Sequence, residues 1–366
     1  MAVVCWVCLG CSPTCTPRMS VERKAWGTFE GQEVSLYTLC NSAGMTVKVS
    51  DYGATLVDVQ TPDRNGNVAS VVLGFDSLQR YLDNHPNFGS TIGRYAGRIC
   101  GASFALDDTL YQLKANRNGS IIHGGAKGFN RQLFRVENAY TTNDTAAVRL
   151  SYTSPDGEEG FPGTLRFCLT YKLTDRNEVI LEYEATTDKP TVVNFTNHSY
   201  FNLNGCTAPV LNHRLVVDAD SLCVTDAHGI PNGEFKAVCN TPYDFRQCSN
   251  IGDSIGNLPK GYDICYKLNT DRPEGLTQVA DVSDPATGRT LKAYTSEPGM
   301  QLFVGLIDLG NFVGHGGTRY GKCYGLCLEM QHFPDSPNQQ HFPSTVLRPG
   351  ETYRQTTIYT FGVLNT

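Results

Sequence analysis

The ten residues from Asn194 to Leu203 combine a histidine with amides, hydroxyls and aromatic rings in a very short space. His198 lies at the centre of this stretch, which directly follows the β-branched run 191–193. Each polar group needs a hydrogen-bond partner if it is buried, and a strand points alternate side chains at a common cavity. A groove that binds the hydroxyls and C–H faces of a sugar is lined in this way. A polar strand end with a surface histidine explains the same residues equally well.

A second reactive group, Glu329, stands at the end of the apolar run 324–328. An acid in a turn or on a charged face would stay hydrated. Burial here would instead raise the pKa of the carboxyl group and make it a better base near neutral pH. Glu329 and His198 together supply one base and one acid, which is what a proton-transfer reaction on a sugar requires.

Two further segments combine glycines with side chains that can bind a ligand. Residues 87–99 carry Arg94 and Arg98 on an otherwise apolar stretch, and a guanidinium group suits sugar oxygens or a carboxylate. An arginine that ties a loop to a carboxylate is the slightly favoured alternative. His123 precedes the glycine turn 124–128, which lets the backbone approach a ligand closely. A buried histidine with structural partners is the alternative there.

Two polar residues lie inside aromatic segments, Asp263 within 260–266 and Gln301 within 299–303. Several other chemistries lack their signatures in this chain. No His-Glu-x-x-His pattern indicates a metal hydrolase. The glycines after His123 also lack the Gly-Lys-Ser/Thr ending of a phosphate loop. The residues therefore favour acid and base catalysis on a sugar.

The charge of the chain argues against nucleic-acid binding. Its 30 basic and 36 acidic residues give a net charge of −6, and no block of lysines and arginines stands out. No run of about 18 apolar residues predicts a membrane span. The 14 cysteines are scattered, which favours mostly free thiols in a reducing, cytoplasmic setting. Those that stand singly are expected to be small buried apolar side chains: Cys40, Cys100, Cys168, Cys206, Cys223, Cys239, Cys248 and Cys265.

The N-terminal segment has a different character. Cys5, Cys8, Cys11 and Cys15 have a spacing that superficially resembles metal ligands, but no second cluster of cysteine or histidine follows. The short apolar run has no positively charged segment before it, as a signal peptide would have. We expect residues 1–20 to be a poorly ordered extension without a catalytic role, and residues 21–366 to form the folded domain. A membrane-associated or acylated segment is the alternative.

From residue 21 onward, short β-rich runs alternate with glycine, proline, asparagine and aspartate. Helical periodicity is scarce apart from a turn expected at 78–82. No fixed repeat and no Pro/Ser-rich linker divides the chain. We therefore predict an all-β protein, a single large antiparallel β-sandwich. Its strands are expected at 45–50, 55–60, 71–75, 147–152, 165–173, 179–185, 214–217, 290–295, 301–306, 324–331 and 356–361, with turns at 62–67 and 174–177.

Taken together, the motifs resemble those of the aldose 1-epimerase (galactose mutarotase) family from about Gly27 to the C-terminus. The matching pieces are Gly-Arg-x-Ala-x-Arg-Ile at 93–99, His-Gly-Gly at 123–125, Asn-His-Ser-Tyr-Phe-Asn-Leu at 197–203, Asp263, Gln301, and Leu-Glu-x-Gln-x-x-Pro-Asp-x-x-Asn-Gln at 328–339. One such motif would be weak evidence. The full set in the family's order is hard to obtain by chance.

This resemblance implies a β-supersandwich and an isomerase that interconverts the α and β anomers of free aldohexoses such as glucose and galactose. It implies no metal and no organic cofactor. By position, Glu329 would be the general base that takes the proton of the C1 hydroxyl, and His198 the general acid that protonates the ring oxygen. The substrate-binding residues would be Arg98, His123, Asp263 and Gln301. The expected partner is the small aldose alone, bound by a cytoplasmic monomer or homodimer.

The chain departs from the family pattern at two positions. Gly97 stands where many members have asparagine, which removes one potential sugar contact, and His332 stands where asparagine is frequent. Three alternatives stay open. A hexose-6-phosphate 1-epimerase would need more basic groups than the two arginines near the motifs. A glycoside hydrolase using Glu329 and Asp263 would leave the histidines unused. A non-catalytic sugar-binding or sensing protein would share the fold.

Overall fold

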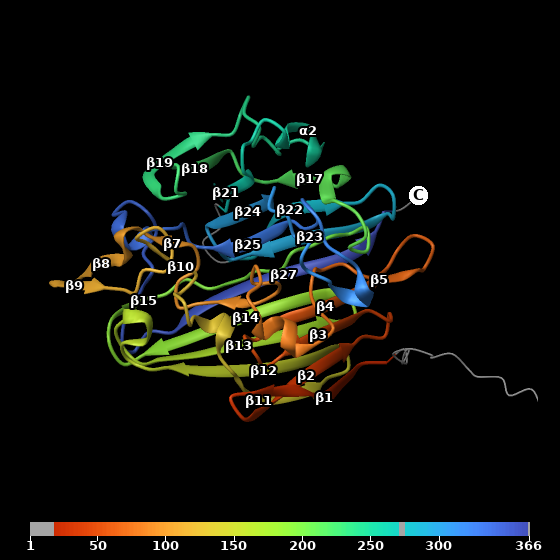
Figure 1. Ribbon diagram of the computed structural model, residues 1–366, viewed down its shortest axis with the longest axis horizontal. Coiled ribbons are helices and arrows are strands. Elements are labelled where there is room, and N and C mark those ends of the chain that lie inside the picture. The colour runs from red at the N-terminus through yellow and green to blue at the C-terminus, as the bar shows by residue number, and fades with distance from the viewer. Residues whose placement is uncertain (1–17, 271–274, 365–366) are drawn as a thin grey trace, which may run out of the picture.

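The computed structural model describes residues 18–270 and 275–364, and within them nine strands form one large antiparallel sheet (Figure 1). Its strand order is β11 (Arg135–Thr141), β12 (Thr145–Ser154), β13 (Leu165–Thr174), β14 (Glu178–Thr187), β27 (Tyr353–Val363), β23 (Arg289–Thr295), β22 (Thr277–Ser283), β17 (Arg214–Val217) and β20 (Ser249–Asn250). The last strand of the chain, β27, lies between β14 and β23 and thereby joins the earlier and later strands of the sheet.

Two smaller antiparallel sheets of the described chain complete the sandwich. The first has the order β1 (Ser20–Phe29), β2 (Gln32–Cys40), β3 (Thr46–Ser50), β4 (Thr55–Pro62) and β5 (Val68–Ser70). The second has the order β19 (Pro231–Ala237), β18 (Ser221–Thr225), β21 (Gly261–Lys267), β24 (Gly299–Gly305) and β25 (Cys327–Gln331). In Figure 1 the first sheet lies over β11–β13, and the second lies near β22 and β23.

Short elements connect these sheets. Four two-stranded pairs occur in the described residues: β6 (Thr91–Ile92) with β16 (Thr196–Asn197), β7 (Arg98–Ile99) with β10 (Ile121–Ile122), β8 (Ser103–Leu106) with β9 (Thr109–Gln112), and β15 (Thr191–Val192) with β26 (Val346–Leu347). The α-helices there are α1 (Leu78–Leu82) and α2 (Gly252–Ile255). Neither of these helices is long or apolar enough to cross a membrane.

The core lies between the large sheet and the two smaller ones. Side chains alternate along β13, so that Leu165, Phe167 and Leu169 are completely buried on one face, as predicted. They belong to a single apolar cluster that also holds Leu39 of β2 and Leu328 of β25. Burying each such side chain stabilises the fold by roughly 1.5–3 kcal/mol before the entropy of ordering is subtracted.

Most predicted strands are confirmed with small shifts at their ends, and the helical turn at 78–82 is α1. The predicted strand at 71–75 is wrong. This segment is fully buried and extended, but it forms an isolated bridge between Val72 and Phe201 instead of joining a sheet. Its neighbours add hydrogen bonds from the Leu73 N–H to the Tyr200 carbonyl and from the Asn202 N–H to the Val71 carbonyl. Segment 71–75 therefore runs antiparallel to residues 200–202 and holds the polar stretch around His198 in place.

The cysteines follow the prediction only in part. In the described ranges nine are free thiols, and Cys206, Cys223 and Cys265 are buried as expected. The prediction of burial is wrong for three cysteines that lie outside strands and are exposed, Cys100, Cys239 and Cys248. Cys5, Cys8, Cys11 and Cys15 lie outside the described residues. The domain boundary at residue 20 stays a prediction, and β1 begins at Ser20.

Candidate active site

Three neighbouring strands of the second small sheet carry the predicted polar residues on one face. Gln301 of β24 is the cross-strand partner of Glu329 on β25. Asp263 of β21 lies diagonally across the same face, and Gln301 Nε2 donates a hydrogen bond to Asp263 Oδ1 at 2.6 Å. Leu302 and Leu328, the alternate residues, enter the core on the other face. The two-residue period of the strands therefore separates the site from the core.

His198 reaches this face from the segment that follows β16. Its Nε2 lies 3.7 Å from Glu329 Oε1, and the two side chains are only 8% and 3% exposed. The Tyr200 ring stacks on the imidazole with 5.1 Å between centroids and 12° between planes. Cys327 Sγ lies 3.6 Å from His198 Nδ1 on the other side of the ring. These neighbours hold one edge of the imidazole towards the carboxyl group.

The other polar groups around His198 have structural partners. Asn194 Nδ2 donates to the carbonyls of Ala96 and His332, and Asn197 Nδ2 donates to the Gly89 carbonyl and the Tyr171 hydroxyl. Asn202 Nδ2 likewise donates to two carbonyls at 2.8 and 2.6 Å. The prediction that alternate polar residues of this stretch line a common groove is therefore wrong for these amides. They tie loops together, and His198 is the member of the stretch that faces Glu329.

His123 and Arg98 complete the cluster from the β7–β10 pair, in which Ile122 lies opposite Arg98. The His123 ring meets the His198 ring edge to face, with centroids 5.3 Å apart. Arg98 Nη2 lies 3.6 Å from Asp263 Oδ2. His123 has a left-handed backbone with φ 53°, and its N–H donates to the Gly97 carbonyl at 2.9 Å. The six predicted site residues thus lie in one cluster, although they come from six separate segments of the chain.

Arg94 plays a different part from Arg98. It is 2% exposed, and its guanidinium donates to Ser154 Oγ and to the carbonyls of Ser154, Pro155 and Pro162. The structural alternative therefore applies to Arg94, with backbone carbonyls as the main partners in place of the expected carboxylate. Arg98 is the arginine that enters the site.

Burial moves the pKa values of the central pair in opposite directions. Loss of hydration, helped by the Asp263 carboxylate, raises the pKa of Glu329 to about 8, although Arg98 opposes the shift. Burial lowers the pKa of His198 to about 4. It also lowers the pKa of His123 well below its ordinary value, with the charges of His198 and Arg98 acting in the same direction. At pH values between about 4 and 8, the Glu329–His198 pair therefore holds one proton. The prediction that burial raises the Glu329 pKa is confirmed.

His123, His198 and Glu329 each offer a ligand atom, and these atoms lie within 4.8 Å of one another. Two neutral imidazoles and an ionised carboxylate are also a ligand set for a divalent transition metal. The same geometry therefore permits either a proton-transferring pair or a metal site, and a chelator separates the two.

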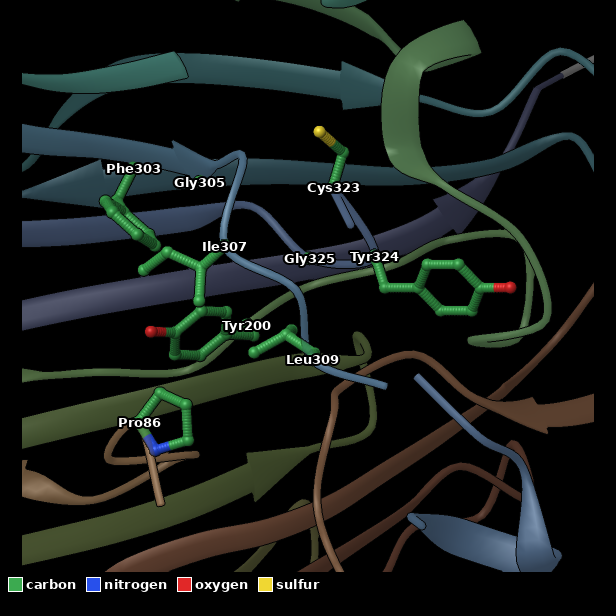
Figure 2. Close-up of a pocket in the computed structure, with 9 residues that line it drawn as sticks. All are labelled: Pro86, Tyr200, Phe303, Gly305, Ile307, Leu309, Cys323, Tyr324 and Gly325. Carbon is green, nitrogen blue, oxygen red and sulfur yellow. The ribbon is translucent and has the colours of Figure 1, made fainter. Parts of the chain in front are cut away.

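An apolar pocket adjoins the cluster (Figure 2). Its lining residues are Pro86, Tyr200, Phe303, Gly305, Ile307, Leu309, Cys323, Tyr324 and Gly325. Tyr200 connects this pocket to the site because its ring stacks on His198, and Phe303 lies 6.0 Å from Tyr200 between centroids. Tyr200 thus supports the imidazole.

A family model described as Aldose 1-epimerase matches residues 35–360. This chain belongs to the aldose 1-epimerase family. It is 38% identical to the galactose mutarotase of Bos taurus over 321 residues, which cover 87% of this chain and 92% of the relative. It is also 38% identical to the aldose 1-epimerase of Escherichia coli over 339 residues, 91% of this chain and 96% of the relative.

Solved structures of the aldose 1-epimerase family share the fold. The aldose epimerase homologue of Caenorhabditis elegans superposes with a TM-score of 0.84 at 29% identity, covering 91% of this chain and all of that one. The galactose 1-epimerase of Lactobacillus acidophilus has a TM-score of 0.82 at 28% identity, covering 95% of this chain and all of that one. The predicted family and the predicted single all-β sandwich are thereby confirmed.

Proposed function

We propose that this member of the aldose 1-epimerase family interconverts the α and β anomers of free aldohexoses such as galactose and glucose. The observation that carries the proposal is the buried pair of His198 Nε2 and Glu329 Oε1, which lie 3.7 Å apart and together hold one proton near neutral pH. Relatives named galactose mutarotase and aldose 1-epimerase, at 38% identity over most of the chain, support the same reaction.

The reaction moves one proton off a sugar and returns another. In the proposed mechanism Glu329 takes the proton from the C1 hydroxyl while His198 protonates the ring oxygen, so that the C1–O5 bond breaks and an aldehyde forms. Rotation about C1–C2 exposes the other face of the aldehyde, and the ring closes with both proton transfers reversed. Each transfer by a positioned group contributes about 10²–10⁴-fold to the rate.

The pKa values in the free protein place the single proton on Glu329 at neutral pH. The form with ionised Glu329 and protonated His198 also holds one proton. Its population therefore varies with pH in the same way as that of the form with protonated Glu329 and neutral His198. Because both groups act as acid and base in turn during opening and closing, the pair needs one proton in total. Ring opening uses the form with ionised Glu329 and protonated His198, and ring closure starts from the form with protonated Glu329 and neutral His198.

The surrounding residues are proposed to hold the sugar. Arg98 and His123 would contact the ring-oxygen side, and Asp263 and Gln301 would contact hydroxyls farther along the ring. The expected substrate is a small aldose, bound by a monomer or homodimer in the cytoplasm. The hydrogen bond from Gln301 to Asp263 supports a paired role, because it fixes the carboxylate in one orientation.

Asp263→Asn is expected to raise KM about 5- to 100-fold for the preferred aldose, because a charge-assisted hydrogen bond to a hydroxyl is lost. The same change removes a negative charge that raises the pKa of Glu329. The alkaline limb of the rate profile should therefore move to lower pH. Steady-state rates at several pH values measure both effects. An unchanged KM for every aldose tested would contradict the role of Asp263.

The pH profile of kcat/KM is expected to be bell-shaped, with limbs near pH 4 and 8. Below about pH 4 the pair gains a second proton and lacks a base. Above about pH 8 it loses its only proton and lacks an acid. Polarimetric rates, corrected for the spontaneous reaction at each pH, measure the profile. A flat profile from pH 5 to 10 would contradict a one-proton pair. At pH 10, about two units above the upper pKa, the pair would have lost its proton almost completely.

The proposed function is tested by the optical rotation of freshly dissolved α-D-galactose and α-D-glucose with and without the protein. Faster relaxation to the same final rotation supports the proposal, and the ratio of rates ranks the sugars. A parallel run after treatment with a chelator tests the metal alternative, which requires the rate to fall and to return with added Zn²⁺. Sugar binding without any acceleration would favour a non-catalytic sensor. Release of a nitrophenol from a nitrophenyl glycoside would favour a hydrolase.

One observation supports a second candidate function, that of a hexose-6-phosphate 1-epimerase. A small pocket next to the site is lined by Arg98, Arg117 and His228 together with Ser120. Arg117 also contributes to the lowered pKa of His123, which shows that its charge lies near the cluster. Phosphate oxygens suit such basic groups. Glucose 6-phosphate in the polarimetric assay, with Arg117→Ala as the discriminating variant, decides between the two substrates.

A further inference from the structure

Gln331 is a buried side chain without a visible partner. It is 1% exposed, and neither its Nε2 nor its Oε1 has a hydrogen-bond partner among the described residues. Buried amide groups in proteins are almost always hydrogen-bonded, because an unpaired one carries the full cost of lost hydration. An amide left open in this way is best explained by a ligand that satisfies it.

Gln355 shows what a structural buried glutamine looks like in the same region. It is 2% exposed, its Nε2 donates to the Met330 carbonyl at 3.0 Å, and its Oε1 accepts the Tyr353 hydroxyl at 2.9 Å. Both ends of its amide are therefore used within the protein. The contrast indicates that the position of Gln331 serves a purpose other than holding strands together.

The strand geometry places Gln331 at the site. It follows Glu329 by two residues on β25, so both side chains leave the strand on the same face, whereas Met330 enters the core. A carboxyl group and an unpaired amide thus stand next to each other along one strand.

Gly97 adds an independent link to the site. It has a left-handed backbone with φ +75°, and a Cβ atom there would lie 3.5 Å from Gln331 Nε2. The Gly97 N–H points to His123 Nδ1 at 3.4 Å, and the next residue is Arg98. Gln331 therefore borders the backbone that leads into Arg98 and is hydrogen-bonded to His123, and the Pro334 ring lies beside the same point, 3.2 Å from the Cβ position.

We infer that Gln331 is a further substrate-binding residue, which contacts a hydroxyl group of the aldose beside the backbone of Gly97. The inference rests on the proposed function and extends it to specificity. An amide offers both donors and an acceptor, and a sugar hydroxyl needs one of each. A site built to pair a hydroxyl rejects an analogue that lacks it, because the buried polar group is then left unpaired.

The test compares Gln331→Met with Gln355→Met as the matched control. Methionine keeps the unbranched shape and removes the amide in both variants. Each protein is assayed with galactose, glucose and their 2-, 3-, 4- and 6-deoxy analogues, and its melting temperature is measured. For Gln331→Met we expect KM for the parent sugar to rise about 10- to 100-fold with little change in kcat, and an unchanged or higher melting temperature, since no protein hydrogen bond is lost.

One deoxy sugar should react equally well with wild type and Gln331→Met, because it lacks the hydroxyl that the amide contacts. Gln355→Met should instead lower the melting temperature and treat all sugars alike. A uniform effect of Gln331→Met on every sugar, or no effect on any, would overturn the inference. If the wild type accelerates no anomer exchange, the proposed function fails. In that case, the affinities of wild type and Gln331→Met for the same sugars are measured by calorimetry. Equal affinities of the two proteins would overturn the inference about Gln331.

Discussion

Replacing Glu329 by glutamine is expected to lower the turnover of aldoses by about 10²–10⁴-fold, with the fold intact. Glutamine keeps the shape of the side chain but cannot accept the C1 proton. Glu329 is 2% exposed, and its Oε2 has no hydrogen-bond partner in the described residues, so the substitution breaks no hydrogen bond at that oxygen. Polarimetry with galactose measures the loss, and full activity of the variant would contradict the mechanism.

Stability provides a second measurement on the same Glu329→Gln variant. Because the folded-state pKa of Glu329 is raised to about 8, the fold favours the protonated carboxyl group. That stabilisation is complete below the ordinary pKa and is lost as the pH rises through about 8. Glutamine cannot ionise, so the melting temperature of the variant at pH 9 should equal or exceed that of the wild type. A lower value would indicate that lost activity reflects damage to the fold.

Glu297→Gln is the matched control for this loss. Glu297 is also 2% exposed, and it accepts hydrogen bonds from His332 Nδ1 at 2.6 Å and from the Tyr353 hydroxyl at 3.3 Å. Its substitution should weaken the fold, because a charged partner of His332 is removed. We expect turnover per folded molecule to stay near the wild-type value.

Replacing His198 by glutamine is expected to reduce turnover by a similar factor, about 10²–10⁴-fold, because the ring oxygen then leaves without a proton donor. The bell-shaped profile should be replaced by a rate that rises as the pH passes through about 8, since the imidazole is gone and the remaining base, Glu329, acts only when it is ionised. Rates over the same pH range measure both effects. Retention of the complete bell-shaped profile would show that another group serves as the acid.

His213→Gln is the control that separates position from burial. His213 is 1% exposed, and burial lowers its pKa to about 4, as it does for His198. Its Nε2 accepts the Leu203 N–H at 2.8 Å, and Asp284 lies 3.9 Å from Nδ1. Removal of this ring should lower the melting temperature but leave the turnover per folded molecule near the wild-type value. A lowered histidine pKa is therefore shared by both residues, and the proposed role of His198 as the acid rests on its position beside Glu329.

The sequence by itself determined the family and the all-β class and supplied the six proposed site residues, because these rest on local patterns. Alternation along 165–173 predicts a half-buried strand whatever its partners are. Glu329 at the end of an apolar run predicts a buried acid in the same way, and the structure bears out both its burial and its raised pKa. Short motifs also state which residue types are present at the site.

Only the tertiary structure decided which polar residues lie together in the cluster around His198 and Glu329. Arg94 and Arg98 look alike in the sequence, yet one binds carbonyls in the interior and the other reaches Asp263. Gln331 gave no separate signal, because the absence of a partner for its amide appears only when all surrounding atoms are placed. A hydrogen-bond partner can come from any distance along the chain, so the same residue type in the same local pattern serves either the fold or the reaction.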